Sequence, residues 1–122
     1  MQYLLLIYDQ ESQWGKLNEA EQGKMMHEYG QLTKSIQQSG HYLASSQLHP
    51  VSKATTVRVR DGKKLVTDGP FAETNEQIGG FILIEARDLN EAIQLASRIP
   101  VIRFGGVEVR PVKELVASDG RK

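Results

Sequence analysis

The stretch YLLLIY, residues 3–8, is an uninterrupted apolar and aromatic run, and it decides the fold class. A strand with one face in water alternates apolar and polar residues, whereas a continuous run indicates a strand covered on both faces. The run FILI, residues 81–84, has the same character. Both runs therefore predict strands of a sheet that needs a cover on each face.

A long helix is predicted between these strands, from Asn18 to Ser39. Its apolar residues recur at steps of four, three and four, which places them on one helix face. Asn18 and Glu21 have the spacing of a capping box, and Gly40 is suited to end the helix. The apolar stripe consists of Met25, Tyr29, Leu32 and Ile36.

The remaining elements complete an alternating order of strands and helices. The pattern predicts strands over 41–48 and 106–112, a hairpin of 55–60 and 64–67 around Asp61-Gly62, and a helix from Asp88 or Asn90 to Ile99, before Pro100. Residues 1–115 are expected to form a single domain, with a flexible tail at 116–122. The order is that of a ferredoxin-like βαββαβ fold of the α+β class, with an inserted β-hairpin.

The two helices of such a fold cover only one face of the sheet. Because the strands at 3–8 and 81–84 are apolar on both faces, the second face must meet a partner chain, a ligand cavity or both. We predict a homodimer packed sheet to sheet, with a cleft between sheet and helices or at the subunit boundary.

Composition excludes several classes of function. The 15 basic and 15 acidic residues of the 122-residue chain cancel, so no overall field attracts nucleic acid or an anionic membrane. The absence of cysteine removes disulfides, thiolate nucleophiles and cysteine zinc sites, and it is typical of a cytoplasmic protein. His27, His41 and His49 lack the spacing of a metal site, so neither a metal nor another cofactor is expected.

The segment TDGPFAET, residues 67–74, joins the hairpin to the second apolar strand and is open to two interpretations. In the structural one, Asp68 caps a rigid turn, Phe71 anchors the loop in the core, and Thr74 and Gln77 define one helical turn. In the functional one, Asp68 projects into a cleft, because the loop carries more carboxylates than a turn needs.

These residues also resemble a known family. The runs YLLLIY, VRVRDGK (57–63), VTDGPFAET (66–74), EQIGGF (76–81) and VEVRP (107–111) are similar to the DGPF-domain branch of the YCII-related proteins. The resemblance implies a bacterial protein with a dimeric α/β-barrel fold. Some relatives act on small aromatic compounds, one as a dehydrochlorinase, and the branch is often encoded beside alternative sigma factors. The wider group is described with a His-Asp pair, but His27 is predicted to face away from the apolar stripe.

The functional interpretation assigns a role to six residues. Asp68 is the candidate general base, Tyr29 a phenolic donor, and His41 a further catalytic candidate near the first helix. The candidate ligand-binding residues are Arg58, which suits an anionic group, Phe71 and Glu73. Trp14 is expected in the loop after the first strand, as a lid or dimer anchor.

We therefore expect a protein that binds a small organic molecule. Cofactor-independent proton transfer or elimination is the reaction class that Asp, Tyr and His side chains support. One alternative is a non-catalytic regulatory or interaction module, associated with a sigma factor, in which Lys24, His27 and Lys34 on the first helix matter most. Another is that the DGPF loop completes a dimer interface.

Overall fold

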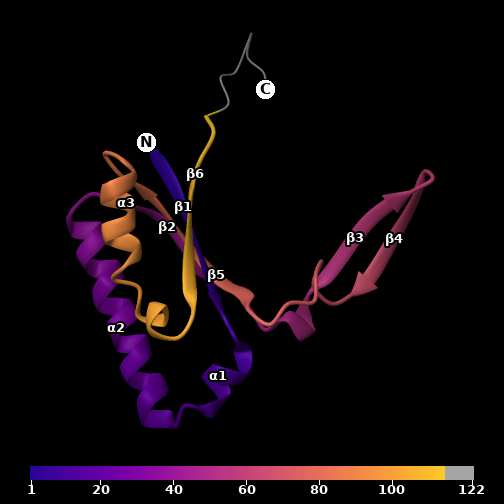
Figure 1. Cartoon of the computed structure of the whole chain (residues 1–122), viewed down its shortest axis with the longest axis horizontal. Coiled ribbons are helices and arrows are strands. Elements are labelled where there is room, and N and C mark those ends of the chain that lie inside the picture. Colours follow the sequence, from indigo (N-terminus) through magenta and orange to yellow (C-terminus); the bar gives the residue numbers. More distant parts are fainter. Residues whose placement is uncertain (115–122) are drawn as a thin grey trace.

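The computed structural model describes residues 1–114, and the predicted tail at 116–122 lies outside the described residues. Four strands form an antiparallel sheet in the order β2-β5-β1-β6, and two others form a separate hairpin (Figure 1). The strands are β1 (Gln2–Asp9), β2 (Tyr42–Gln47), β3 (Thr55–Arg60), β4 (Lys63–Asp68), β5 (Gln77–Glu85) and β6 (Gly106–Pro111). The helices are α1 (Glu11–Lys16), α2 (Glu19–Gln38) and α3 (Leu89–Ala96), with 3-10 helices η1 (Val51–Lys53) and η2 (Pro100–Arg103). The predicted α+β class is confirmed.

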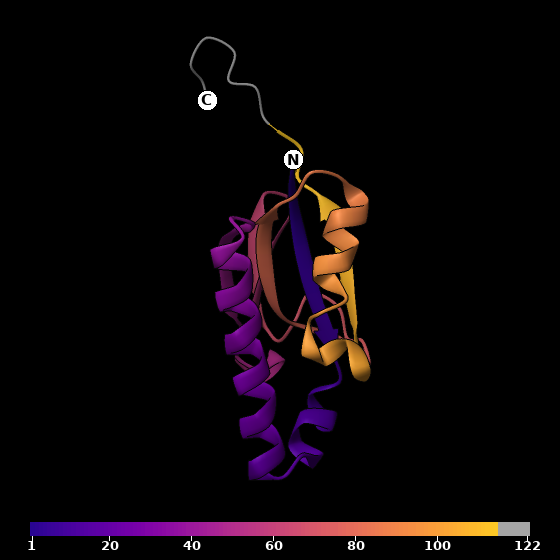
Figure 2. The same cartoon turned by 90° about the vertical axis from the view of Figure 1, so that its left-hand side faces the viewer.

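The hydrophobic core lies between the sheet and the helices. Both α2 and α3 cover the same face of the sheet (Figure 2). Tyr3, Leu5 and Ile7 of β1 point into this core and are buried, whereas Leu4 and Leu6 point to the other face and are only half-buried. The chain therefore covers one face of its central strand, although the sequence of that strand is apolar on both.

Helix α2 begins and ends where the sequence predicts. The Asn18 side chain accepts a hydrogen bond from the Glu21 backbone N–H at 2.8 Å, and the Glu21 carboxylate accepts one from the Asn18 N–H at 2.9 Å. Of the predicted stripe, Met25, Leu32 and Ile36 are buried. The fourth member, Tyr29, is half-buried, which leaves its ring at the border between core and solvent.

Helix α1 was not predicted by the sequence. Trp14, expected in a loop, lies within this short helix. Six residues form less than two turns, too few for a hydrophobic repeat to appear. Tertiary contacts hold the helix, since the Gln22 side-chain amide donates hydrogen bonds to the Trp14 and Leu17 carbonyls at 3.1 and 3.2 Å.

The hairpin forms around Asp61-Gly62 as predicted. Both residues have positive φ, 52° and 74°, as a two-residue hairpin turn requires. Its two strands do not join the four-stranded sheet. They extend outward on the side of that sheet opposite the helices (Figure 1).

The DGPF turn differs from its prediction in two respects. Phe71 does not anchor the loop in the core, because its side chain is 74% exposed. The expected helical turn at Thr74–Gln77 does not form either, and the Thr74 hydroxyl instead donates a hydrogen bond to the Glu76 carbonyl. Proline and glycine fix a turn locally, but they do not determine which side of it meets the core.

The described helices are either too short or too polar to cross a membrane.

Candidate functional site

A cleft of about 650 Å³ opens between α1, the middle of α2, the ends of β1 and β2, and the first half of β5. Its wall is largely apolar, and a few polar groups converge on it, which is the usual composition of a small-molecule site. The apolar wall includes Trp14, Met25, Met26, Leu48, Val101 and Phe104, and the ionisable groups are Asp9, Glu11, Tyr29 and His49.

Asp9 is the last residue of β1, at the point where the central strand reaches the cleft. Gly79 of β5 lies beside its carboxylate, and a Cβ atom at that position would come within 3.4 Å of Asp9 Oδ1. Burial raises the pKa of the Asp9 carboxyl, and the negative charges of Glu11 and Glu76 raise it further. Asp9 is thus a carboxylate whose surroundings favour taking up a proton.

Tyr29 enters the same cleft from α2. Burial is the main cause that raises the pKa of its phenol to about 12, and the charge of Asp9 adds to it, while a backbone hydrogen bond from Val101 acts in the opposite direction. At neutral pH the phenol is therefore protonated. Tyr29 offers a neutral hydrogen-bond donor close enough to sense the Asp9 charge.

The mouth of the cleft is held together by a contact between distant parts of the chain. The Glu11 carboxylate at the start of α1 accepts a hydrogen bond from the Val51 backbone N–H at 2.8 Å. Val51 begins η1, which follows β2. This contact fixes α1, and with it Trp14, beside the end of β2.

The predicted ligand-binding residues lie on the hairpin and in the turn that follows it, outside this cleft. The Arg58 guanidinium lies 4.5 Å from the centre of the Phe71 ring and donates a hydrogen bond to the Phe71 carbonyl at 3.3 Å. Asp68 and Glu73 are exposed. The buried Thr56 hydroxyl donates to the Gly69 carbonyl at 2.8 Å and fastens the turn to its own strand. Of the six predicted residues, only Tyr29 lines the cleft.

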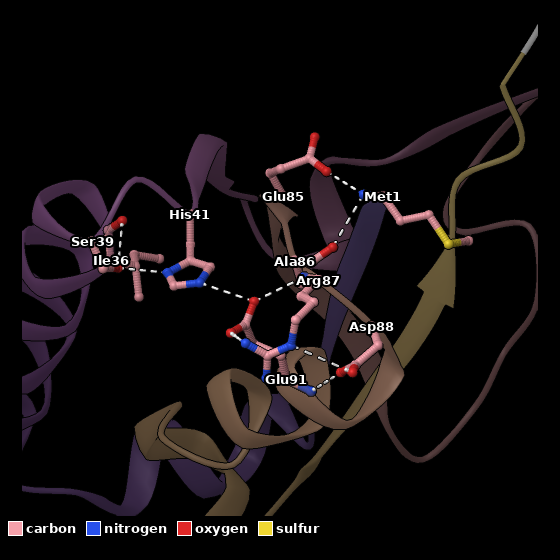
Figure 3. A network of polar contacts seen from close by, with 9 residues as sticks. All are labelled: Met1, Ile36, Ser39, His41, Glu85, Ala86, Arg87, Asp88 and Glu91. Carbon is pink, nitrogen blue, oxygen red and sulfur yellow. Dashed lines mark hydrogen bonds and ion pairs between the residues drawn. The ribbon is translucent and has the colours of Figure 1, made fainter.

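His41 lies at the far end of α2, in a polar network that joins three elements (Figure 3). Its Nδ1 is 2.6 Å from the Ser39 hydroxyl, and its Nε2 is 3.1 Å from Glu91 of α3. The Arg87 backbone N–H donates to the same Glu91 carboxylate at 2.8 Å, and this bond is the main cause that lowers the Glu91 pKa. His41 therefore ties α2 to α3, and it does not line the cleft that Tyr29 enters.

A second groove, of about 510 Å³, lies between α2 and η2. Two arginines line it, and both are already bound. Arg103 pairs with Glu28 at 2.7 Å, and Arg98 donates to the Ser35 hydroxyl at 2.7 Å. The groove is therefore a weaker candidate than the cleft for a ligand site.

Sequence reasoning missed Asp9 and Glu11, whereas Trp14, expected as a lid or dimer anchor, lines the cleft. The one available signal for Asp9 was its position, since it is the first charged residue after the apolar run 3–8. A polar side chain directly after a buried strand often lies at a functional edge of a sheet.

Comparison with known proteins adds the family. The sequence matches the YCII-related domain over residues 1–116. The chain belongs to the YCII-related family. It is also similar to an uncharacterised protein of Rhizobium meliloti (strain 1021), with 33% identity over 114 residues and 92% of each chain covered. The resemblance to YCII-related proteins is confirmed, and the match gives no activity.

In this YCII-related protein, His27 is exposed on α2, as the helical spacing predicted. It does not line the cleft, whereas Asp9 and Tyr29 do, and these two side chains are the candidate acid–base pair. A carboxylate that accepts a proton and a neutral phenol that donates a hydrogen bond are complementary groups for proton transfer.

Proposed function

We propose that this YCII-related protein binds a small organic molecule in the cleft beneath α2 and transfers a proton on it. The observation that carries the proposal is the pairing of Asp9 and Tyr29 in one largely apolar cleft, each with a raised pKa. Groups whose pKa values are shifted by burial and by neighbouring charges gather at functional sites more often than elsewhere.

The two side chains suit a substrate with a carbonyl group. The Tyr29 hydroxyl donates a hydrogen bond to the carbonyl oxygen, and the Asp9 carboxylate takes a proton from the neighbouring carbon. The C–H electron pair moves into the new C=C bond of an enolate, whose negative oxygen the phenol stabilises. Asp9 then returns the proton at another position, or a leaving group departs from the next carbon in an elimination. Neither route requires an oxidant or a reductant.

We also propose that the four-stranded sheet is the ferredoxin-like unit of a dimeric α/β barrel. Its strand order, with β1 and β5 central and all neighbours antiparallel, supports this assignment. The uncovered face presents half-buried apolar side chains, Leu4, Leu6, Phe81 and Leu83. A second copy packed on this face removes them from water, as the doubly apolar strands require.

The test is a backbone-amide NMR titration with small aromatic and carbonyl compounds, in parallel on the wild type, Asp9→Asn and Asp68→Asn. The wild type is expected to show saturable shifts at Asp9, Trp14 and Tyr29. In D₂O the wild type is also expected to exchange deuterium into a bound carbonyl compound, and Asp9→Asn should lose this exchange. Asp68→Asn is the matched control, because it makes the same chemical change on the hairpin.

Two results would contradict the proposal. Shifts confined to the hairpin, lost in Asp68→Asn, would move the site to the DGPF turn. A folded wild type that binds no member of a broad pool would direct the search to protein partners, including a sigma factor.

A further inference from the structure

The hairpin is unusual because its apolar surface is turned to solvent. Val57 and Val66 are paired across the two strands, and Val59 lies on the same face two residues along. Their exposed fractions are 59%, 57% and 62%. A two-stranded hairpin without a third strand or a helix on one face is marginally stable in water. This valine face therefore needs a partner.

The charge of the hairpin indicates what that partner carries. We define the hairpin arm as residues 53–68, which contain five basic and two acidic side chains, a net charge of +3. The chain as a whole is neutral, so the opposite charge lies elsewhere. Residues 9–28, which form α1 and the first half of α2, contain five acidic and two basic side chains, a net charge of −3. We call this segment the acidic end.

Within one copy, the arm does not lie along the acidic end. It projects from the uncovered side of the sheet, whereas α2 lies on the covered side (Figure 1). Strands of six residues are about 20 Å long, enough to cross a pair of packed helices. The arm thus has the reach and the charge to contact the acidic end of another copy.

We propose that the hairpin arm of each copy lies against the acidic end of a second copy and borders that copy's cleft. The valine face packs on the apolar rim of the cleft, where Met26 and Leu48 are 45% and 46% exposed. Lys64, which pairs with Val59, lies on the same face and is positioned for the carboxylates of the partner. The cleft of each copy is then completed by the hairpin arm of the other copy, which lies at its entrance.

This contact rests on the self-association proposed above, and it adds a separate interface to the sheet-to-sheet one. Two copies related by a two-fold axis exchange their arms reciprocally, so each arm finds the same surface on its partner. Opposite charges also orient the two copies before they meet, and salt weakens this effect.

The test uses the absence of native cysteine in the chain. Unlabelled Val59→Cys protein carries a nitroxide and is refolded together with ¹⁵N-labelled wild type. Only contacts between copies broaden the observed signals, since the observed copy has no nitroxide. Broadening is expected at α1 and the first turns of α2. Gln94→Cys on the exposed surface of α3 is the control and should leave these signals sharp.

The outcomes separate the two proposals. If light scattering shows a monomer, both the dimer and the arm contact are overturned. If the protein is a dimer whose acidic end stays sharp, the arm contact alone is overturned and the sheet interface stands. Lys63→Cys, at the exposed end of β4, repeats the experiment should Val59→Cys not fold.

Discussion

Two acids occupy similar places in the chain and very different places in the molecule. Asp9 ends β1 and is followed by α1, and Asp68 ends β4 and is followed by the DGPF turn. Asp9 lies in the cleft, where burial and neighbouring carboxylates raise its pKa, whereas Asp68 lies exposed at the base of the hairpin. The contrast shows that a distinctive local motif marks a special backbone conformation, while a reactive group is made by what packs around it.

The largest expected effect is the loss of stability when a glycine beside the cleft is replaced. At Gly105, beside the cleft, a Cβ atom would come within 2.2 Å of the Tyr8 carbonyl oxygen and 3.1 Å of Asp9 Cβ. Gly105→Ala should therefore force β1 and β6 apart and lower the free energy of unfolding by about 3 kcal/mol or more, measured by urea denaturation. Its neighbour Gly106, with nothing within 4 Å of an added Cβ, is the matched control and should change by less than about 0.5 kcal/mol.

Gly69, in the turn after β4, is constrained by its backbone conformation and not by neighbouring atoms. Gly69 has φ of +109° and open surroundings, so Gly69→Ala should cost about 1–3 kcal/mol through backbone strain. A Gly105→Ala cost below that of Gly69→Ala would mean that the cleft end is loosely packed, and it would break the contrast between the two regions.

The second effect is the response of stability to pH at Asp9. A carboxyl with a raised pKa in the folded chain binds its proton more tightly there than in the unfolded chain. The stabilisation that this tighter proton binding gives the folded chain is fully present below the ordinary aspartate pKa of 3.8. It is lost as the pH rises through the higher pKa of Asp9 in the folded chain. Asp9→Asn should therefore be more stable than the wild type at pH 7, and the advantage should disappear toward pH 3.

Thermal unfolding of the wild type, Asp9→Asn and Asp68→Asn between pH 3 and 8 measures this difference. Asp68→Asn makes the same chemical change at an exposed acid and serves as the reference. A less stable Asp9→Asn at pH 7 would show that the Asp9 carboxylate supports the fold, and it would remove the argument for its role as a base.

Sequence alone predicted the elements that local patterns determine. The capping box of α2, the Asp-Gly hairpin turn and the start of α3, for which the structure selects Asp88 over Asn90, all depend on residues within four positions of one another. The apolar stripe of α2 likewise predicted that Tyr29 lies on the same helix face as the core residues, and the structure places it at the border of the core. These features follow from geometry that a short segment specifies by itself.

The cleft required contacts that no short segment specifies. Glu11 meets Val51 across 40 residues, and the Asp9 carboxylate lies beside Gly79 of β5. The prediction for Phe71 was wrong in the opposite direction, from buried to exposed. An aromatic residue next to proline suggested an anchor in the core, yet the ring stacks on Arg58 at the surface. Burial is a property of the whole packed chain, so pKa shifts and cavities are the last features that sequence reasoning reaches.

The smallest expected effect tests whether the DGPF turn is held by its own hairpin. Arg58→Gln removes the stacking of the guanidinium on the Phe71 ring, an interaction worth about 0.5–1 kcal/mol at exposed sites. Overall stability should fall by no more than that, while the Phe71 ring signals in NMR should move toward those of a free side chain. Arg60→Gln, two residues along the same strand, is the control that should leave the ring signals in place. If Arg58→Gln instead altered the signals of Asp9 and Tyr29 within its own copy, the cleft and the hairpin would be coupled inside one chain, and the two regions would have to be treated as a single site.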